Sequence, residues 1–71
     1  MTALEQVASS CLSDVGYNHC ARVLMLEFQH GGIYYYSDVP PFIYEGLMTA
    51  PSLGRFFQRY IRQEYRFERM A

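Results

Sequence analysis

Five arginines in the C-terminal part of the sequence recur at a spacing that suits one face of a helix. They are Arg55, Arg59, Arg62, Arg66 and Arg69. On a helix that continues unbroken to residue 69, they would lie within about 80° of one another. Because guanidinium groups form paired hydrogen bonds with phosphate oxygens, this spacing predicts a face that follows a nucleic-acid backbone. The alternative is a solvated helix face whose arginines pair with the acidic part of the chain itself.

The charge of the chain is divided between its two parts. Residues 1–50 carry one arginine against five acidic residues, a net charge of −4. Residues 51–71 carry five arginines against two glutamates, a net charge of +3. The formal net charge of the whole chain is −1. A protein that is acidic overall is an unusual non-specific binder of nucleic acid, because the field of the whole molecule does not attract polyanions.

Three consecutive tyrosines form a second group that could bind a partner. On a strand, Tyr34 and Tyr36 would share one face and Tyr35 would lie on the other. We assign Tyr34 and Tyr36 to the core, together with the alternating apolar residues of the preceding strand, which are Leu24, Leu26 and Phe28. The opposite face would then carry an apolar patch formed by Val23, Met25, Ile33 and Tyr35.

This apolar patch has two uses that fit its composition. Tyr35 could stack on a base, as aromatic side chains do in sheet-based RNA-binding domains. Exposed apolar patches also commonly mark a dimer interface or the docking site of another protein. If the alternation of the strand is reversed, Tyr34 and Tyr36 take the exposed role instead.

No catalytic or metal-binding constellation is present in the sequence. His19 and His30 have no cysteine, aspartate or glutamate at metal-ligand spacing, and Cys11 and Cys20 match no zinc pattern. No serine lies in a nucleophile motif, and the scattered glycines form no phosphate-binding loop. We therefore predict a protein that is not an enzyme and that needs no metal or cofactor, unless a site is built across a dimer.

The elements that must position these residues can be placed from periodicity. Strands are predicted over residues 9–17, 21–28 and 33–37, with Gly31 and Gly32 in the loop of a hairpin. Residues 41–50 form a helix that Pro51 ends, and Ser52 is the N-cap of a second helix. The predicted class is α+β, a three-stranded antiparallel β-meander followed by two α-helices packed on one face.

With 71 residues the chain makes one domain, which we place at residues 9–71 after an N-terminal arm of residues 1–8. No apolar run approaches the roughly 20 residues of a transmembrane helix, and the N-terminus does not have the pattern of a signal peptide. We therefore expect a cytoplasmic protein without a membrane partner.

An ordered set of residues resembles a known small domain. The set begins with Ser9 and the segment 16–18 and continues through the alternating strand 24–28, the segments 32–40 and 44–47, and the stretch from Ala50 to Tyr65. Over residues 7–65 it is similar to the KTSC domain, named for its place at the C-terminus of some lysyl-tRNA synthetases. The family also includes free-standing short proteins of bacteria and phages. One departure is Gln58, where the family usually has asparagine.

The resemblance implies a fold of three strands and two helices and, through its attachment to a tRNA-charging enzyme, a role in RNA binding. We therefore predict a small binding module that uses the arginines and Tyr35 to bind RNA, either tRNA or single-stranded RNA. The alternative is a bacterial or phage accessory protein that binds a larger host protein. In that case the arginines meet an acidic partner and Val23, Met25 and Ile33 supply an apolar anchor. Either a monomer or a homodimer fits these readings.

Overall fold

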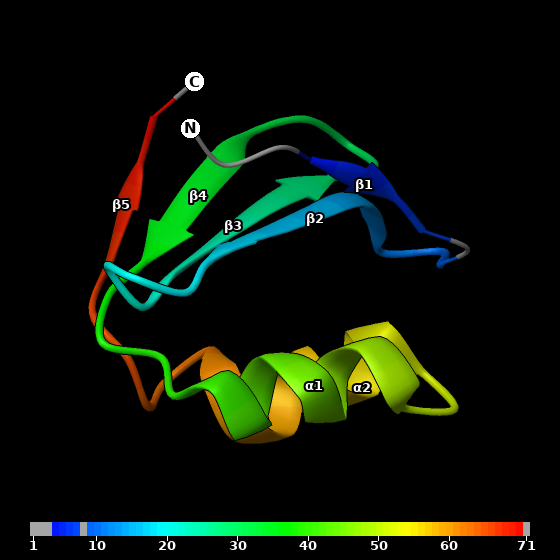
Figure 1. Cartoon of the computed structure of the whole chain (residues 1–71). Coiled ribbons are helices and arrows are strands. Elements are labelled where there is room, and N and C mark those ends of the chain that lie inside the picture. Colours follow the sequence, from blue (N-terminus) through cyan, green and yellow to red (C-terminus); the bar gives the residue numbers. More distant parts are fainter. Residues whose placement is uncertain (1–3, 8, 71) are drawn as a thin grey trace.

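The computed structural model describes residues 4–7 and 9–70, which form a five-stranded antiparallel sheet with helices on one of its faces (Figure 1). The strands lie in sequence order across the sheet. They are β1 (Glu5–Gln6), β2 (Leu12–Asn18), β3 (Val23–Phe28), β4 (Ile33–Tyr36) and β5 (Phe67–Arg69). The helical segments are α1 (Pro41–Thr49), α2 (Leu53–Phe56) and the π-helical turn η1 (Phe57–Ile61).

The predicted α+β class is confirmed, but the prediction of three strands is wrong. The predicted strands correspond to β2, β3 and β4, and the described residues add a short strand at each edge. At one edge, Glu5 pairs with Val15 and Gln6 with Asp14, so part of the predicted N-terminal arm belongs to the sheet. Residues 1–3 and 8 of that arm lie outside the described residues.

The central hairpin has the predicted alternation of side chains. Leu24 pairs with Tyr36 and Leu26 with Tyr34, so all four side chains point to the face that the helices cover. Tyr36 is 3% exposed, whereas Tyr35 is 36% exposed on the other face. The assignment of Tyr34 and Tyr36 to the core side is therefore confirmed.

One apolar core lies between the sheet and the helices. Its fully buried members come from strands, helices and the link between them, and they are Leu12, Val15, Leu24, Leu26, Val39, Leu47 and Ile61. Tyr36 and Phe57 complete the buried cluster. Because a chain of this size buries only about 60% of its unfolded surface, each of these residues carries a large share of the stability.

The first helix ends close to its predicted position. Pro40 is the N-cap and Pro41 the first helical residue, where the missing N–H of proline costs no hydrogen bond. The helix ends at Thr49, with Ala50 as C-cap before Pro51. Leu47 is its fully buried residue and therefore fixes the helix against the sheet.

The second helix begins at its predicted cap. Ser52 is its N-cap, as expected, and the Ser52 hydroxyl accepts a hydrogen bond from the backbone N–H of Arg55 at 3.3 Å. After Phe56 the helix widens into η1, where the N–H of Arg62 donates to the carbonyl of Phe57 at 2.9 Å. The α2–η1 segment ends at Ile61, so the condition for a single face of five arginines, a helix unbroken to residue 69, is not met.

The chain leaves the helix because the free edge of β4 offers unpaired backbone groups. The N–H of Ser37 donates to the carbonyl of Arg66 at 2.8 Å, and the N–H of Met70 donates to the carbonyl of Ile33 at 2.7 Å. Between these bonds, Phe67 pairs with Tyr36 across the strands. An edge strand that satisfies these groups replaces the last turns of the predicted helix.

Replacing Gly32 with alanine is expected to lower the free energy of unfolding by about 1–3 kcal/mol. The φ angle of Gly32 is +96°, and an added Cβ would lie 3.0 Å from Cε1 of Tyr34. Gly31→Ala is the matched control, because its φ is +107° but nothing lies within 4 Å of the added Cβ. Urea denaturation should show a larger loss of unfolding free energy for Gly32→Ala than for Gly31→Ala. Equal losses for the two variants would contradict the proposed contact with Tyr34.

Candidate nucleic-acid interface

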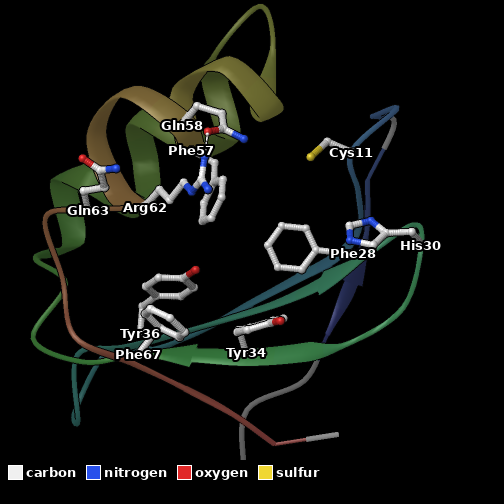
Figure 2. A pocket seen from close by; sticks show the side chains of 10 residues that line it. All are labelled: Cys11, Phe28, His30, Tyr34, Tyr36, Phe57, Gln58, Arg62, Gln63 and Phe67. Carbon is white, nitrogen blue, oxygen red and sulfur yellow. Dashed lines mark hydrogen bonds between the residues drawn. The ribbon is translucent and has the colours of Figure 1, made fainter.

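A cavity of about 520 Å³ lies between the second helical segment and the inner face of the sheet. Figure 2 shows side chains of the helix on one side of it and side chains of β3, β4 and β5 on the other. We call it the aromatic cavity. It is lined by Cys11, Phe28, His30, Tyr34, Tyr36, Phe57, Gln58, Arg62, Gln63 and Phe67.

Five aromatic rings contact one another around the aromatic cavity. Phe28 lies edge-on to Tyr34 and to Phe57, with ring centroids 5.3 and 5.4 Å apart. Phe67 lies beside Tyr34 at 5.7 Å and beside Tyr36 at 5.4 Å. Such edge-to-face and tilted contacts hold the rings in defined orientations. The cavity is therefore walled by preformed flat apolar surfaces.

Polar groups of the helix lie on the other side of the aromatic cavity. The guanidinium of Arg62 donates from Nη1 to Oε1 of Gln58 at 2.9 Å, which holds both side chains on the helix surface (Figure 2). Gln63, in the turn after η1, and His30, in the turn between β3 and β4, add further hydrogen-bonding groups. The lining residues include no aspartate or glutamate. Among the lining residues that the structure describes, Arg62 is the only one with a permanent charge.

A second cavity of about 570 Å³ adjoins the first along the same helix. It shares Cys11 and Gln58 with the aromatic cavity and adds Arg55 and Arg59. Its other lining residues are Ser10, Ser52 and Gly54, so it also lacks acidic side chains. We call the two cavities together the basic groove. Three arginines lie along it on the helix side, and the aromatic rings lie at one of its ends.

The structure divides the predicted arginine face. Arg55, Arg59 and Arg62 are exposed along or directly after the α2–η1 segment, as predicted for one helix face. Arg66 lies in the turn before β5, and Arg69 lies on β5 with its guanidinium carbon 5.8 Å from the centre of the Tyr34 ring. The last two therefore belong to the sheet edge and not to the helix.

The alternative explanation was that the arginines pair with acidic residues of the same chain. It does not hold for the three helical arginines. Arg55, Arg59 and Arg62 form no ion pair with any residue in the part of the chain that the structure describes. The bond of the Arg62 guanidinium to the neutral amide of Gln58 leaves its charge uncompensated. These three cations are therefore available to an anionic partner.

The apolar patch lies on the opposite face of the sheet from the basic groove. Tyr35 pairs with Met25 across the strands, and Ile33 pairs with Glu27. Met25 is 8% exposed, although it does not belong to the core cluster. Val23 and Ile33 are half-buried. Tyr35 and the helical arginines, both predicted to bind RNA, are thus separated by the thickness of the sheet.

The sequence analysis did not identify the aromatic walls of the groove. Phe28 and Tyr34 were predicted only as core residues, and no pattern in the sequence placed Phe57 and Phe67 beside them. They meet because β5 returns to the sheet, a long-range pairing for which its three residues provide little periodic signal. The departure at Gln58 was noticed, but its bond to Arg62 depends on the structure.

Tyr36 is the residue of the aromatic cavity whose pKa is clearly shifted. Burial raises the pKa of Tyr36 above its ordinary value of 10.0; the neighbouring Tyr34 raises that pKa further, and the cation of Arg62 lowers it. Tyr36 therefore remains a neutral hydrogen-bonding group throughout the physiological pH range.

The stability of the protein is expected to fall as pH rises above about 10, because the unfolded chain loses the Tyr36 proton while the folded protein keeps it. The raised pKa in the folded state gives this sign, and Tyr17, whose pKa burial also raises, acts in the same direction. Chemical denaturation at several alkaline pH values should show a shallower decline for Tyr36→Phe. Identical declines for both proteins would contradict a buried, neutral Tyr36.

Two further observations concern metals and membranes. Among residues 4–7 and 9–70, no three His, Cys, Asp or Glu side chains converge to hold a metal ion. Within the same part of the chain, no helix has the length and apolar character to span a bilayer.

Comparison with known proteins places the chain in a family. Residues 8–65 match the KTSC domain. The crystal structure of a KTSC domain protein from Yersinia pestis superposes with a TM-score of 0.97 over 100% of both chains, at 30% sequence identity. A small protein of Stutzerimonas stutzeri is 40% identical over 63 residues, which is 87% of this chain and 89% of that protein.

The same segment also occurs inside much larger proteins. A lysine–tRNA ligase of Nostoc punctiforme is 34% identical over 62 residues, which cover 87% of this chain. The chain spans only 11% of the length of that ligase. The domain is therefore found both as almost the whole of a small protein and as a short part of a tRNA ligase.

Proposed function

Because this chain belongs to the KTSC domain family, which includes small proteins and part of a lysine–tRNA ligase, we propose that it is an RNA-binding module. A lysine–tRNA ligase acts on tRNA, so a domain shared with such an enzyme has an RNA in its surroundings. That association alone gives no mechanism. The basic groove supplies a physical one.

The observation that carries the proposal is a groove with cations along one side, aromatic rings at one end and no carboxylate among its described lining residues. Arg55, Arg59 and Arg62 provide forked donors for phosphate oxygens. The rings provide apolar surfaces on which bases stack independently of sequence. This combination is typical of proteins that bind single-stranded nucleic acid, and it requires no catalytic group.

RNA binding in this groove is compatible with the negative net charge of the chain. The net charge of the chain is −1, so the whole molecule does not attract RNA from a distance. Binding depends on short-range contacts in the groove, within about a Debye length of 8–10 Å at ordinary salt concentrations. We therefore propose a non-catalytic module with modest affinity for unpaired RNA segments, including those of tRNA.

A second candidate function is docking of a partner protein on the outer sheet face. It is supported by the apolar row of Met25, Tyr35 and Ile33, which no helix of the described chain covers. Three acidic residues share this face, because Glu27 pairs with Ile33, Glu68 with Tyr35, and Asp14 with Glu27. An acidic rim disfavours RNA there, so a protein bound on this face would leave the groove free.

Fluorescence anisotropy with labelled tRNA and labelled single-stranded RNA tests the proposal, using purified protein freed of nucleic acid. Binding is expected in the micromolar range, and log K should fall with log salt with a slope of about −2, corresponding to roughly three phosphate contacts on a single strand. A lack of binding at low salt would refute the RNA-binding function and would leave the partner protein as the remaining candidate.

A further inference from the structure

The aromatic cavity has more exposed aromatic surface than a core requires. Phe67 is 51% exposed although its ring contacts Tyr34 and Tyr36, and Tyr34 itself is only half-buried. A small soluble domain gains stability by covering such rings, and an uncovered set of rings around a concave space is typical of a binding site. The next question is which ligand these rings fit.

We infer that the aromatic cavity receives one unstacked base of the bound RNA, while Arg62 at its rim contacts an adjoining phosphate. This inference rests on the proposed RNA-binding function and deepens it. The size of the cavity, its flat apolar walls and the sign of its charge each restrict the ligand, and a nucleotide satisfies all three.

The size and walls fit a flat ring of nucleotide dimensions. The cavity volume of about 520 Å³ lies within the roughly 300–1,000 Å³ of ordinary small-ligand sites. The rings of Phe67 and Tyr36 are inclined by only 32°, and Phe28 stands nearly perpendicular to Tyr34 at 87°. These orientations offer a planar group one face to stack on and one edge to pack against.

The charge of the lining excludes a cationic ligand. Aromatic cages that bind ammonium groups rely on the negative faces of the rings, and here Arg62 would repel a second cation. The absence of carboxylates from the lining favours an anion instead. The neighbouring cavity, which shares Cys11 and Gln58 with the aromatic cavity, is lined by Arg55 and Arg59, so a strand with its base in the aromatic cavity can extend its phosphates along the helix.

Neutral polar groups are placed to contact the edge of a base. Gln58 and Gln63 project from the helix side, and the hydroxyl groups of Tyr34 and Tyr36 lie on the sheet side (Figure 2). Each of these groups can both donate and accept hydrogen bonds. They can therefore contact the polar edge of a base whose ring lies against the aromatic walls.

The test compares two short oligoribonucleotides of equal length, one unmodified and one in which every base has been removed. The protein variants are Phe67→Leu and Phe28→Leu, which remove a ring of the cavity and keep an apolar side chain. Phe42→Leu is the matched control, because Phe42 is 69% exposed on α1 and does not line the groove. Thermal melting of each variant establishes that it is folded.

The wild-type protein and Phe42→Leu are expected to bind the unmodified oligonucleotide at least roughly ten-fold more tightly than the base-free one. In Phe67→Leu and Phe28→Leu this preference should largely disappear, while binding of the base-free strand is unchanged. Equal binding of both strands by the wild-type protein would overturn the base-binding inference and retain RNA binding through phosphates. If neither strand binds, both the inference and the proposed function are refuted.

Discussion

Replacing Arg55, Arg59 and Arg62 together with glutamine is expected to weaken RNA binding by about a hundred-fold or more. Each guanidinium contributes a charge-assisted contact to a phosphate, and the three lie along one groove without an ion pair to another described residue. The dependence of log K on log salt should also become flatter by about two, because the loss of three phosphate contacts on a single strand releases about two fewer counterions. Anisotropy titrations at several salt concentrations measure both quantities.

The control is Arg22→Gln, which removes one positive charge where the triple variant removes three. Arg22 is exposed in the turn between β2 and β3 and lines neither cavity of the groove. Because its loss alters the net charge but no contact in the groove, the affinity should change by less than about three-fold. If Arg22→Gln weakened binding as much as Arg62→Gln alone, the binding would reflect general charge, and the groove would not be the site.

Replacing Ile61 with alanine is expected to destabilise the protein by about 2–5 kcal/mol. Ile61 ends η1, is 0% exposed and packs in the core directly before Arg62. Its side chain therefore fixes the helix that carries one side of the groove. For a domain of this size, whose total stability is about 4–10 kcal/mol, the melting temperature should fall by about 10–30 °C.

Ile61→Val provides the conservative comparison. It removes one methylene group and should cost only about 0.5–1.5 kcal/mol. Thermal melting followed by circular dichroism measures both variants. A melting temperature of Ile61→Ala within a few degrees of that of the wild-type protein would contradict the placement of this residue in the core.

The sequence was sufficient to predict the parts of the fold that have clear local periodicity. Leu24 and Leu26 lie opposite Tyr36 and Tyr34 on the buried face, as predicted. The period of two in the central hairpin determines which face is buried. Ser52 was recognised as an N-cap from its residue type and position. Such signals depend on neighbours in the sequence, so they can be read before the fold is known.

The second half of the last predicted helix shows where this approach fails. Arg66 and Arg69 continue the helical spacing of the arginines, yet the preference of β4 for an edge partner determines the structure there. A three-residue strand carries too little pattern to oppose that spacing. The candidate site was incomplete for the same reason, because only the pairing of β5 with β4 brings Phe67 to Tyr34.

The division of the predicted site has a consequence for function. Tyr35 and the helical arginines lie on opposite faces of the sheet, so one short RNA segment does not contact both at once. The tyrosines that serve the basic groove are instead Tyr34 and Tyr36, which were assigned to the core. Side chains at the border of the core can thus both stabilise a small domain and line the proposed binding groove.

The central claim is that RNA binds in the basic groove between the helix and the inner face of the sheet. It is tested most directly by titrating isotopically labelled protein with a short single-stranded RNA and following the amide NMR signals. We predict that the largest shifts occur at Gln58, Arg59 and Arg62 and at Tyr34 across the groove, while Met25 on the outer face stays unchanged. Shifts confined to the outer face, or none at all, would contradict the claim.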